Sequence, residues 1–97
     1  MADIRYAARA RADLQQIVDF PVVSDPAAAP ADTVELVASA VEALELHPLL
    51  GRPVEAGLRE LVISRGKSGY LALYRFDEER DRVLVLAIRR QREAGYA

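Results

Sequence analysis

The fold is decided by residues 58–89, LRELVISRGKSGYLALYRFDEERDRVLVLAIR. Residues 58–64 place Leu61 and Ile63 on one face of a strand and Val62 on the other, residues 70–76 are almost wholly apolar, and residues 82–88 carry apolar residues on both faces. Two segments rich in glycine or charge separate these runs, as is typical of strands joined by turns. The stretch therefore predicts a three-stranded meander. Its middle strand, residues 70–76, is expected to be covered on both faces.

Upstream of the meander, the spacing of apolar residues changes to that of helices. Residues 4–6 are expected to form a short strand, and residues 8 to about 20 a helix. After a linker, a second helix is expected from about residue 33 to residue 46. Asp32 before it and Glu35 three residues later form a capping-box pattern, which predicts Asp32 as the N-cap.

These elements predict an α+β fold with the order β-α-α-β-β-β. The simplest packing lays the two N-terminal helices on one face of a small antiparallel sheet, with the first strand added to it. The opposite face would then be free to act as a working surface. A length of 97 residues fits one domain, so residues 1–97 are expected to form a single unit.

Composition narrows the classes of function. The chain has no cysteine and one histidine, so the sequence predicts no disulfide, no thiolate or multi-histidine metal site and no cofactor, and it favours a cytoplasmic protein. No apolar run is long enough to cross a membrane, and the N-terminus lacks a signal-peptide pattern. Residues 1–50 carry three basic and eight acidic groups (−5), and residues 51–97 carry ten and seven (+3). An acidic or polyanionic partner is therefore expected to meet the C-terminal half.

Four short sequences stand out within this pattern. They are HPLLGRP (residues 47–53), which is expected to form a turn, then LREL (58–61), SGYLALY (68–74) and AIRRQREAGY (87–96). In this order, on this strand pattern, they resemble the RelE/ParE toxins of type II, or plasmid-stabilisation, toxin–antitoxin systems over nearly the whole length. The resemblance implies a small cytoplasmic growth inhibitor with a RelE-like fold. It also implies a cognate antitoxin that wraps over the toxin in a hetero-oligomer.

The resembled family contains two chemistries, because its RelE branch cuts mRNA in the ribosome whereas its ParE branch poisons DNA gyrase. Nucleases of the family carry lysines where this chain has Val62 and Ser64, and an arginine where it has Leu71. Valine and leucine neither move a proton nor stabilise an anion. Only Arg90 and, six residues on, Tyr96 match the catalytic set. We therefore expect ParE-like gyrase inhibition. The alternatives are a ribosome-dependent mRNA endoribonuclease and a non-toxic co-repressor that binds its antitoxin.

Basic side chains near the meander are the remaining candidates for the site. The side chains expected to contact a target or an antitoxin are Arg65, Lys67, Arg89 and Arg92. Clustered guanidiniums repel one another, and an anionic partner would relieve this repulsion. The alternative interpretation is a solvated hairpin loop for the first two and pairing with an acid such as Asp13 for the tail. Glu60 and Glu93 are further candidates for a general base.

Overall fold

The computed structural model describes residues 1–19, 30–63 and 69–90, with the side chains of residues 30–32 left aside. In chain order, the elements are β1 (Asp3–Tyr6), α1 (Ala8–Asp19), α2 (Pro30–Glu42), the 3-10 turn η1 (Ala43–Glu45), β2 (Arg52–Pro53), the 3-10 turn η2 (Glu55–Gly57), β3 (Arg59–Ile63), β4 (Tyr70–Asp77) and β5 (Arg82–Arg90). The strands form one sheet in the order β1-β5-β4-β3-β2. The α+β class expected from the sequence is confirmed.

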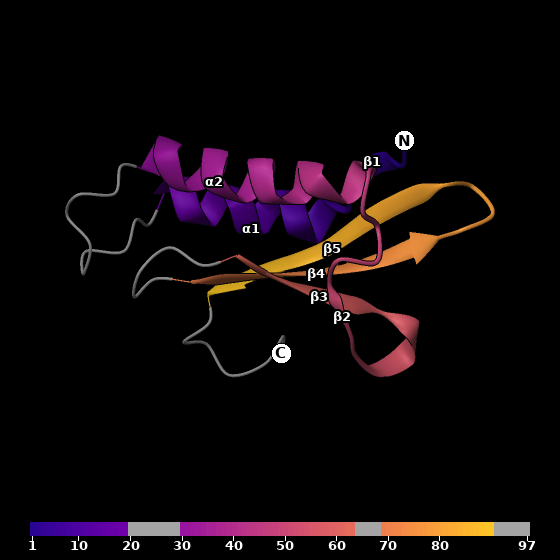
Figure 1. Ribbon diagram of the computed structural model, residues 1–97. Coiled ribbons are helices and arrows are strands. Elements are labelled where there is room, and N and C mark those ends of the chain that lie inside the picture. The colour runs from indigo at the N-terminus through magenta and orange to yellow at the C-terminus, as the bar shows by residue number, and fades with distance from the viewer. Residues whose placement is uncertain (20–29, 64–68, 91–97) are drawn as a thin grey trace.

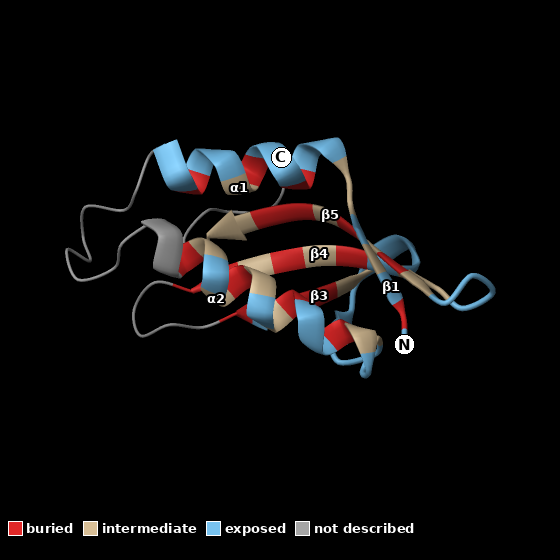
Figure 2. Cartoon of the chain, turned by 90° about the horizontal axis from the view of Figure 1, so that it is seen from above, coloured by how far each residue is buried: buried red, intermediate tan, exposed pale blue. Residues whose placement is uncertain are grey.

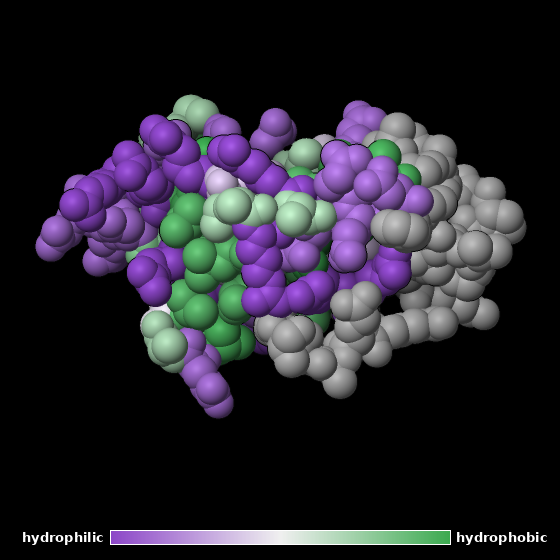
Figure 3. Space-filling view, turned by 180° about the vertical axis from the view of Figure 1, so that it is seen from behind, coloured by the Kyte–Doolittle hydropathy of each residue, from purple (hydrophilic) through white to green (hydrophobic). Residues whose placement is uncertain are grey.

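The molecule has two layers, with both helices over the same face of the sheet (Figure 1). Seen from above, buried residues follow β4 and β5 beneath the helices (Figure 2). The core between the layers includes Ala10, Ile17, Val37, Val41, Leu44, Leu61, Ile63, Tyr70, Ala72, Tyr74, Val83, Val85 and Ile88. The core is thus mainly aliphatic. From behind, polar side chains cover the helices and apolar ones gather in a patch below them (Figure 3).

The sheet differs from the expected antiparallel meander at both of its edges. β1 pairs with β5 in parallel, from Asp3 opposite Arg82 to Tyr6 opposite Val85. At the other edge Arg52 and Pro53, expected in a turn, form β2 against Glu60 and Arg59. Strand direction at an edge depends on how the chain returns from the helices, and two residues are too few to show an alternating pattern.

The middle strand β4 is buried on one face and only half-buried on the other, so the expected cover on both faces is incomplete. Tyr70, Ala72 and Tyr74 are buried, whereas Leu71 and Leu73 are half-buried. Both helices lie over the same face of the sheet, which leaves the opposite face of β4 partly open (Figure 1). In β3 the expected alternation is confirmed, because Leu61 and Ile63 are buried and Val62 is exposed.

A bulge in β5 changes which residues face the core. Leu73 of β4 lies opposite Ala87, but the next residue, Tyr74, lies opposite Val85, so Leu86 is an extra residue. Val83 and Val85 face the helices before the bulge, and Ile88 joins the core after it. Strict alternation along residues 82–88 predicts Ile88 on the face of Leu84 and Leu86. This prediction is wrong, because an extra residue inverts the alternation that follows it.

The second helix begins earlier than expected. α2 starts at Pro30, so Asp32 lies inside the helix and its prediction as the N-cap is wrong. Proline suits the first position of a helix because the amide hydrogen that it lacks would have no helical partner there. After Glu42 the chain tightens into η1, which buries Leu44.

The buried phenol of Tyr74 anchors the segment between η1 and β2. Its hydroxyl accepts a hydrogen bond from the Gly51 amide and donates one to the Pro48 carbonyl, each at 2.8 Å. Arg59 holds the same segment by donating to the Gly51 carbonyl at 2.8 Å. A turn without regular structure is thus fastened to the end of the sheet by two side chains from different strands.

We expect Tyr74→Phe to lower the free energy of unfolding by about 1–3 kcal/mol, because it leaves two buried backbone groups without this partner. Burial raises the pKa of the Tyr74 phenol, an effect that the Gly51 amide and Arg59 oppose. The phenol of the unfolded chain ionises near about pH 10. This contribution to stability is therefore constant below that pH and is lost as the pH rises toward the folded pKa. Urea unfolding between pH 8 and 11 should show a smaller alkaline loss for Tyr74→Phe than for the wild type; parallel curves would contradict this.

Candidate functional site

The candidate site lies at the end of the sheet where β3 and β5 finish and β4 begins. Ile63, Tyr70 and Arg90 form one cross-strand row there, and Val62, Leu71 and Arg89 form the next. Residues in one row of a sheet share a face. Arg90 therefore lies on the face of the buried Tyr70, and Arg89 is in the row of the exposed Val62. Both arginines are partly buried.

Arg89 has a partner inside the chain. Its Nη1 lies 3.5 Å from Oδ1 of Asp13 in α1, and the side chains of the pair are 19% and 9% exposed. This is the pairing that the alternative interpretation of the basic tail proposed. Any partner that binds Arg89 therefore binds an arginine that is already paired with the Asp13 carboxylate.

Asp13 also hydrogen-bonds the backbone of β5, where its Oδ2 accepts from the Ile88 amide at 2.9 Å. That amide is available because β1 pairs with β5 only as far as Val85. The apolar stripe Ala10, Leu14, Ile17 and Val18 predicts Asp13 outside the buried side of the helix, and this prediction is wrong because Asp13 is buried. The missed signal is its spacing, because Asp13 lies three residues after Ala10 and four before Ile17, on the buried side of the helix.

The remaining predicted site residues lie outside the part of the chain that the structure describes. They are Arg65, Lys67, Arg92 and Tyr96. Their role therefore stays a prediction. Among the predicted residues that are described, Arg89 and Arg90 end the same strand.

Apolar side chains occupy two positions where a nuclease of the resembled family carries cations. Val62 and Leu71 are directly opposite each other, with Val62 45% exposed and Leu71 half-buried. Ser64 lies outside the described residues. No side chain in the Val62–Leu71 pair can transfer a proton or stabilise a pentavalent phosphate.

Of the two further candidates for a general base, Glu93 lies outside the described residues and Glu60 is placed away from this pair. Glu60 is buried and forms an ion pair with Arg52, whose Nε donates to Oε1 at 3.0 Å. His47 is exposed in the segment after η1, where its backbone amide donates to the Ala43 carbonyl. Within residues 1–19, 30–63 and 69–90, no three metal-ligating side chains cluster. No helix in these ranges is long and apolar enough to span a bilayer.

The architecture is that of small toxins from bacterial toxin–antitoxin systems. The chain is similar to one from the chromosomal ParDE system of Pseudomonas aeruginosa, with a TM-score of 0.72, 26% identity and coverage of 93% of this chain and 96% of that one. It is also similar to one from the RelBE2 toxin–antitoxin complex of Mycobacterium tuberculosis, with a TM-score of 0.68, 25% identity and coverage of 93% and 98%.

Sequence comparison identifies the family within this class of small toxins. Residues 4–95 match the family model described as the ParE toxin of the type II toxin–antitoxin system parDE. Toxin RelE3 of Caulobacter vibrioides is 33% identical over 93 residues, which covers 96% of this chain and 98% of that protein. The chain belongs to the ParE toxin family of type II toxin–antitoxin systems.

Proposed function

We propose that this toxin arrests growth by acting on DNA gyrase, without cutting RNA. The observation that carries the proposal is the Val62–Leu71 pair, which puts apolar side chains where phosphate-cleaving chemistry needs cations. The ParE family match supports the same choice. We further propose that residues 1–97 act as one domain in the cytoplasm.

A cognate antitoxin is the proposed protein partner, bound in a hetero-oligomer that silences the toxin. The support is that the similar chains were solved in toxin–antitoxin systems. The basic residues Arg65, Lys67, Arg89 and Arg92 are proposed to contact the antitoxin or the target. For Arg89 this contact would have to share the guanidinium with Asp13, so Arg89 would contribute less than an unpaired arginine.

A ribosome-dependent endoribonuclease is the second candidate, favoured by Arg90. Its guanidinium is at the end of β5, and Tyr96 follows six residues later in the sequence. The third candidate is a co-repressor that binds its antitoxin without toxicity, and the two apolar positions fit it equally well. Expression of the chain without an antitoxin separates the three.

We expect induction of the chain alone to stop growth, to alter the supercoiling of a reporter plasmid and to leave mRNA whole by primer extension. Tyr96→Phe should change growth arrest by less than about twofold, because a lost catalytic hydroxyl costs about 10²–10⁴-fold only where it transfers a proton. The effect of Arg90→Ala on growth arrest is compared with that of Arg11→Ala. The second variant is the control, because it removes an exposed arginine from α1. New cuts in translated codons that disappear in Tyr96→Phe would establish the nuclease, and normal growth would establish the co-repressor.

A further inference from the structure

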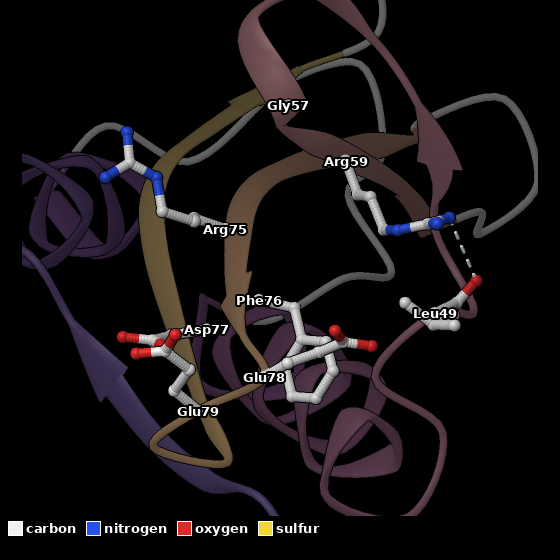
Figure 4. Close-up of a pocket in the computed structure, with 8 residues that line it drawn as sticks. All are labelled: Leu49, Gly57, Arg59, Arg75, Phe76, Asp77, Glu78 and Glu79. Atoms are coloured by element: carbon white, nitrogen blue, oxygen red, sulfur yellow. Dashed lines mark hydrogen bonds between the residues drawn. The ribbon is translucent and has the colours of Figure 1, made fainter.

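A hollow of about 570 Å³ opens at the other end of the sheet from Arg89 and Arg90. It is lined by Leu49, Gly57, Arg59, Arg75, Phe76, Asp77, Glu78 and Glu79 (Figure 4). These residues come from the segment before β2, from η2, from the start of β3, from the end of β4 and from the turn that follows β4. The hollow therefore occupies the place where a neighbouring strand would continue alongside β4.

β4 is longer than its neighbour on this side. Its pairing with β3 ends where Tyr74 meets Arg59, whereas its pairing with β5 continues to Asp77. Before Arg59 the chain is turned aside by η2, where Ala56 and Gly57 have φ values of 60° and 72°. Residues 75–77 consequently form a short free edge of the sheet.

The backbone of Phe76 points out of this free edge. In β5, the Val85 carbonyl accepts from Ala7 and the Ile88 amide donates to Asp13, so both residues direct their backbone away from β4. Tyr74 and Ala72 lie opposite these two residues on β4, so their backbone groups point away from β5. Phe76 does the same, because alternate residues of a strand point the same way. In the described residues neither group of Phe76 has a backbone partner on this side. Such a donor and acceptor are a template for one more strand.

The side chains around the edge define what would bind there. Leu49 is 55% exposed and Phe76 is half-buried, so both present apolar surface to the hollow. Figure 4 shows Arg59 engaged with the Leu49 carbonyl and Arg75 directed away from Phe76. Figure 4 shows the carboxylate of Glu78 beside Phe76, on the side of Leu49, and the carboxylates of Asp77 and Glu79 together on the opposite side. Asp77 is already engaged by Arg80, whose Nη1 lies 2.9 Å from Oδ2, and this hydrogen bond holds the pKa of Asp77 below its usual range.

We propose that this hollow docks an extended segment of a partner protein that alternates apolar and basic side chains. The segment pairs with the backbone of Phe76, places an apolar side chain against Phe76 and Leu49, and sets a lysine or arginine against Glu78. Backbone pairing supplies affinity and the alternate side chains supply specificity, as in other cases of strand addition. The charge complementarity selects a basic partner, in contrast to the anionic partner expected at Arg89 and Arg90. The site is independent of which target the toxin has.

Titration of the isotope-labelled chain with the synthetic peptide Ac-Lys-Val-Lys-Val-Lys-amide, followed by NMR, tests the proposal. Amide shifts should centre on Phe76, Leu49 and Gly57, with slower hydrogen exchange at Phe76 and no change at Arg90. The matched peptide Ac-Glu-Val-Glu-Val-Glu-amide should bind at least tenfold more weakly. Equal binding of the two peptides, shifts centred elsewhere or no shift in excess peptide would overturn the proposal.

Two variants connect the peptide result to the hollow. Glu78→Lys should weaken binding at least tenfold, whereas Glu35→Lys, the same exposed charge change on α2, should leave it within twofold. Both residues are exposed, so both variants should fold, and their unperturbed resonances report this directly. Equal weakening by the two variants would show a general charge effect and would overturn the assignment to this edge.

Discussion

Asp13→Ala should lower the free energy of unfolding by about 2–4 kcal/mol, the largest effect of any single polar substitution that we expect. The carboxylate is nearly buried and serves two groups, the Ile88 amide at 2.9 Å and the Arg89 guanidinium. Its removal leaves a buried amide without a partner and a mostly buried cation without a counter-charge. Both losses carry a desolvation cost that water only partly relieves, because Arg89 is 19% exposed.

Two variants separate these contributions. Asp13→Asn keeps an acceptor for the Ile88 amide and removes the charge, so we expect it to lie between the wild type and Asp13→Ala. Asp19→Ala removes an exposed aspartate of the same helix, and a surface change of this kind should cost within about 0.5 kcal/mol. Urea unfolding gives the free energies, and native-state hydrogen exchange should show faster exchange at Ile88 in Asp13→Ala. If Asp13→Ala costs no more than Asp19→Ala, the proposed anchoring is wrong.

Gly51→Ala should cost about 2–3 kcal/mol through overpacking and the displacement of Tyr74. A Cβ atom at Gly51 would lie 2.6 Å from Cε1 and 2.7 Å from the hydroxyl oxygen of Tyr74, and 3.0 Å from the backbone of Glu60. Tyr74 is fully buried, so its ring has no solvent into which to move. Any shift would lengthen the hydrogen bonds that the phenol makes with Gly51 and Pro48.

Gly57→Ala is the matched control, because that position is uncrowded but has a left-handed backbone. Nothing lies within 4 Å of a Cβ atom placed there, but the backbone has a φ of +72°. Its cost should be that of a left-handed conformation alone, about 1–2 kcal/mol. Calorimetry should therefore rank Gly51→Ala below Gly57→Ala in thermal stability. In addition, only Gly51→Ala should shift the ring resonances of Tyr74. The reverse ranking would mean that the segment before β2 relaxes freely around Tyr74.

Much of the fold could be predicted because its signals are local. The apolar spacing of α1 and the alternation in β3 each depend on neighbours within a few residues. The bulge at Leu86 and the two-residue strand β2 could not be predicted in this way. Each is defined by the register of one strand against another. The spacing of apolar residues along the chain does not show this register.

The candidate site shows the same difference between features set by neighbouring residues and features set by distant segments. Arg89 and Arg90 can be predicted as candidates because the resemblance and the charge cluster lie in adjacent residues. The apolar spacing of α1 alone puts Asp13 on the wrong side of the helix. Its two partners, Ile88 and Arg89, are in a strand 75 or more residues away. A buried charge is recognised by what surrounds it, and that is known only when the helix and the strand are in contact.

The sequence by itself determined the α+β class, the membership of a toxin family and the apolar residues at the two nuclease positions. These features depend on residue types and short spacings, which do not change when the chain folds. Only the tertiary structure decided that Asp13 holds the end of β5 and that β4 extends past β3. Both depend on where strands end against their neighbours, and strand ends are set by the packing of distant segments, because each backbone group must find its partner across the sheet.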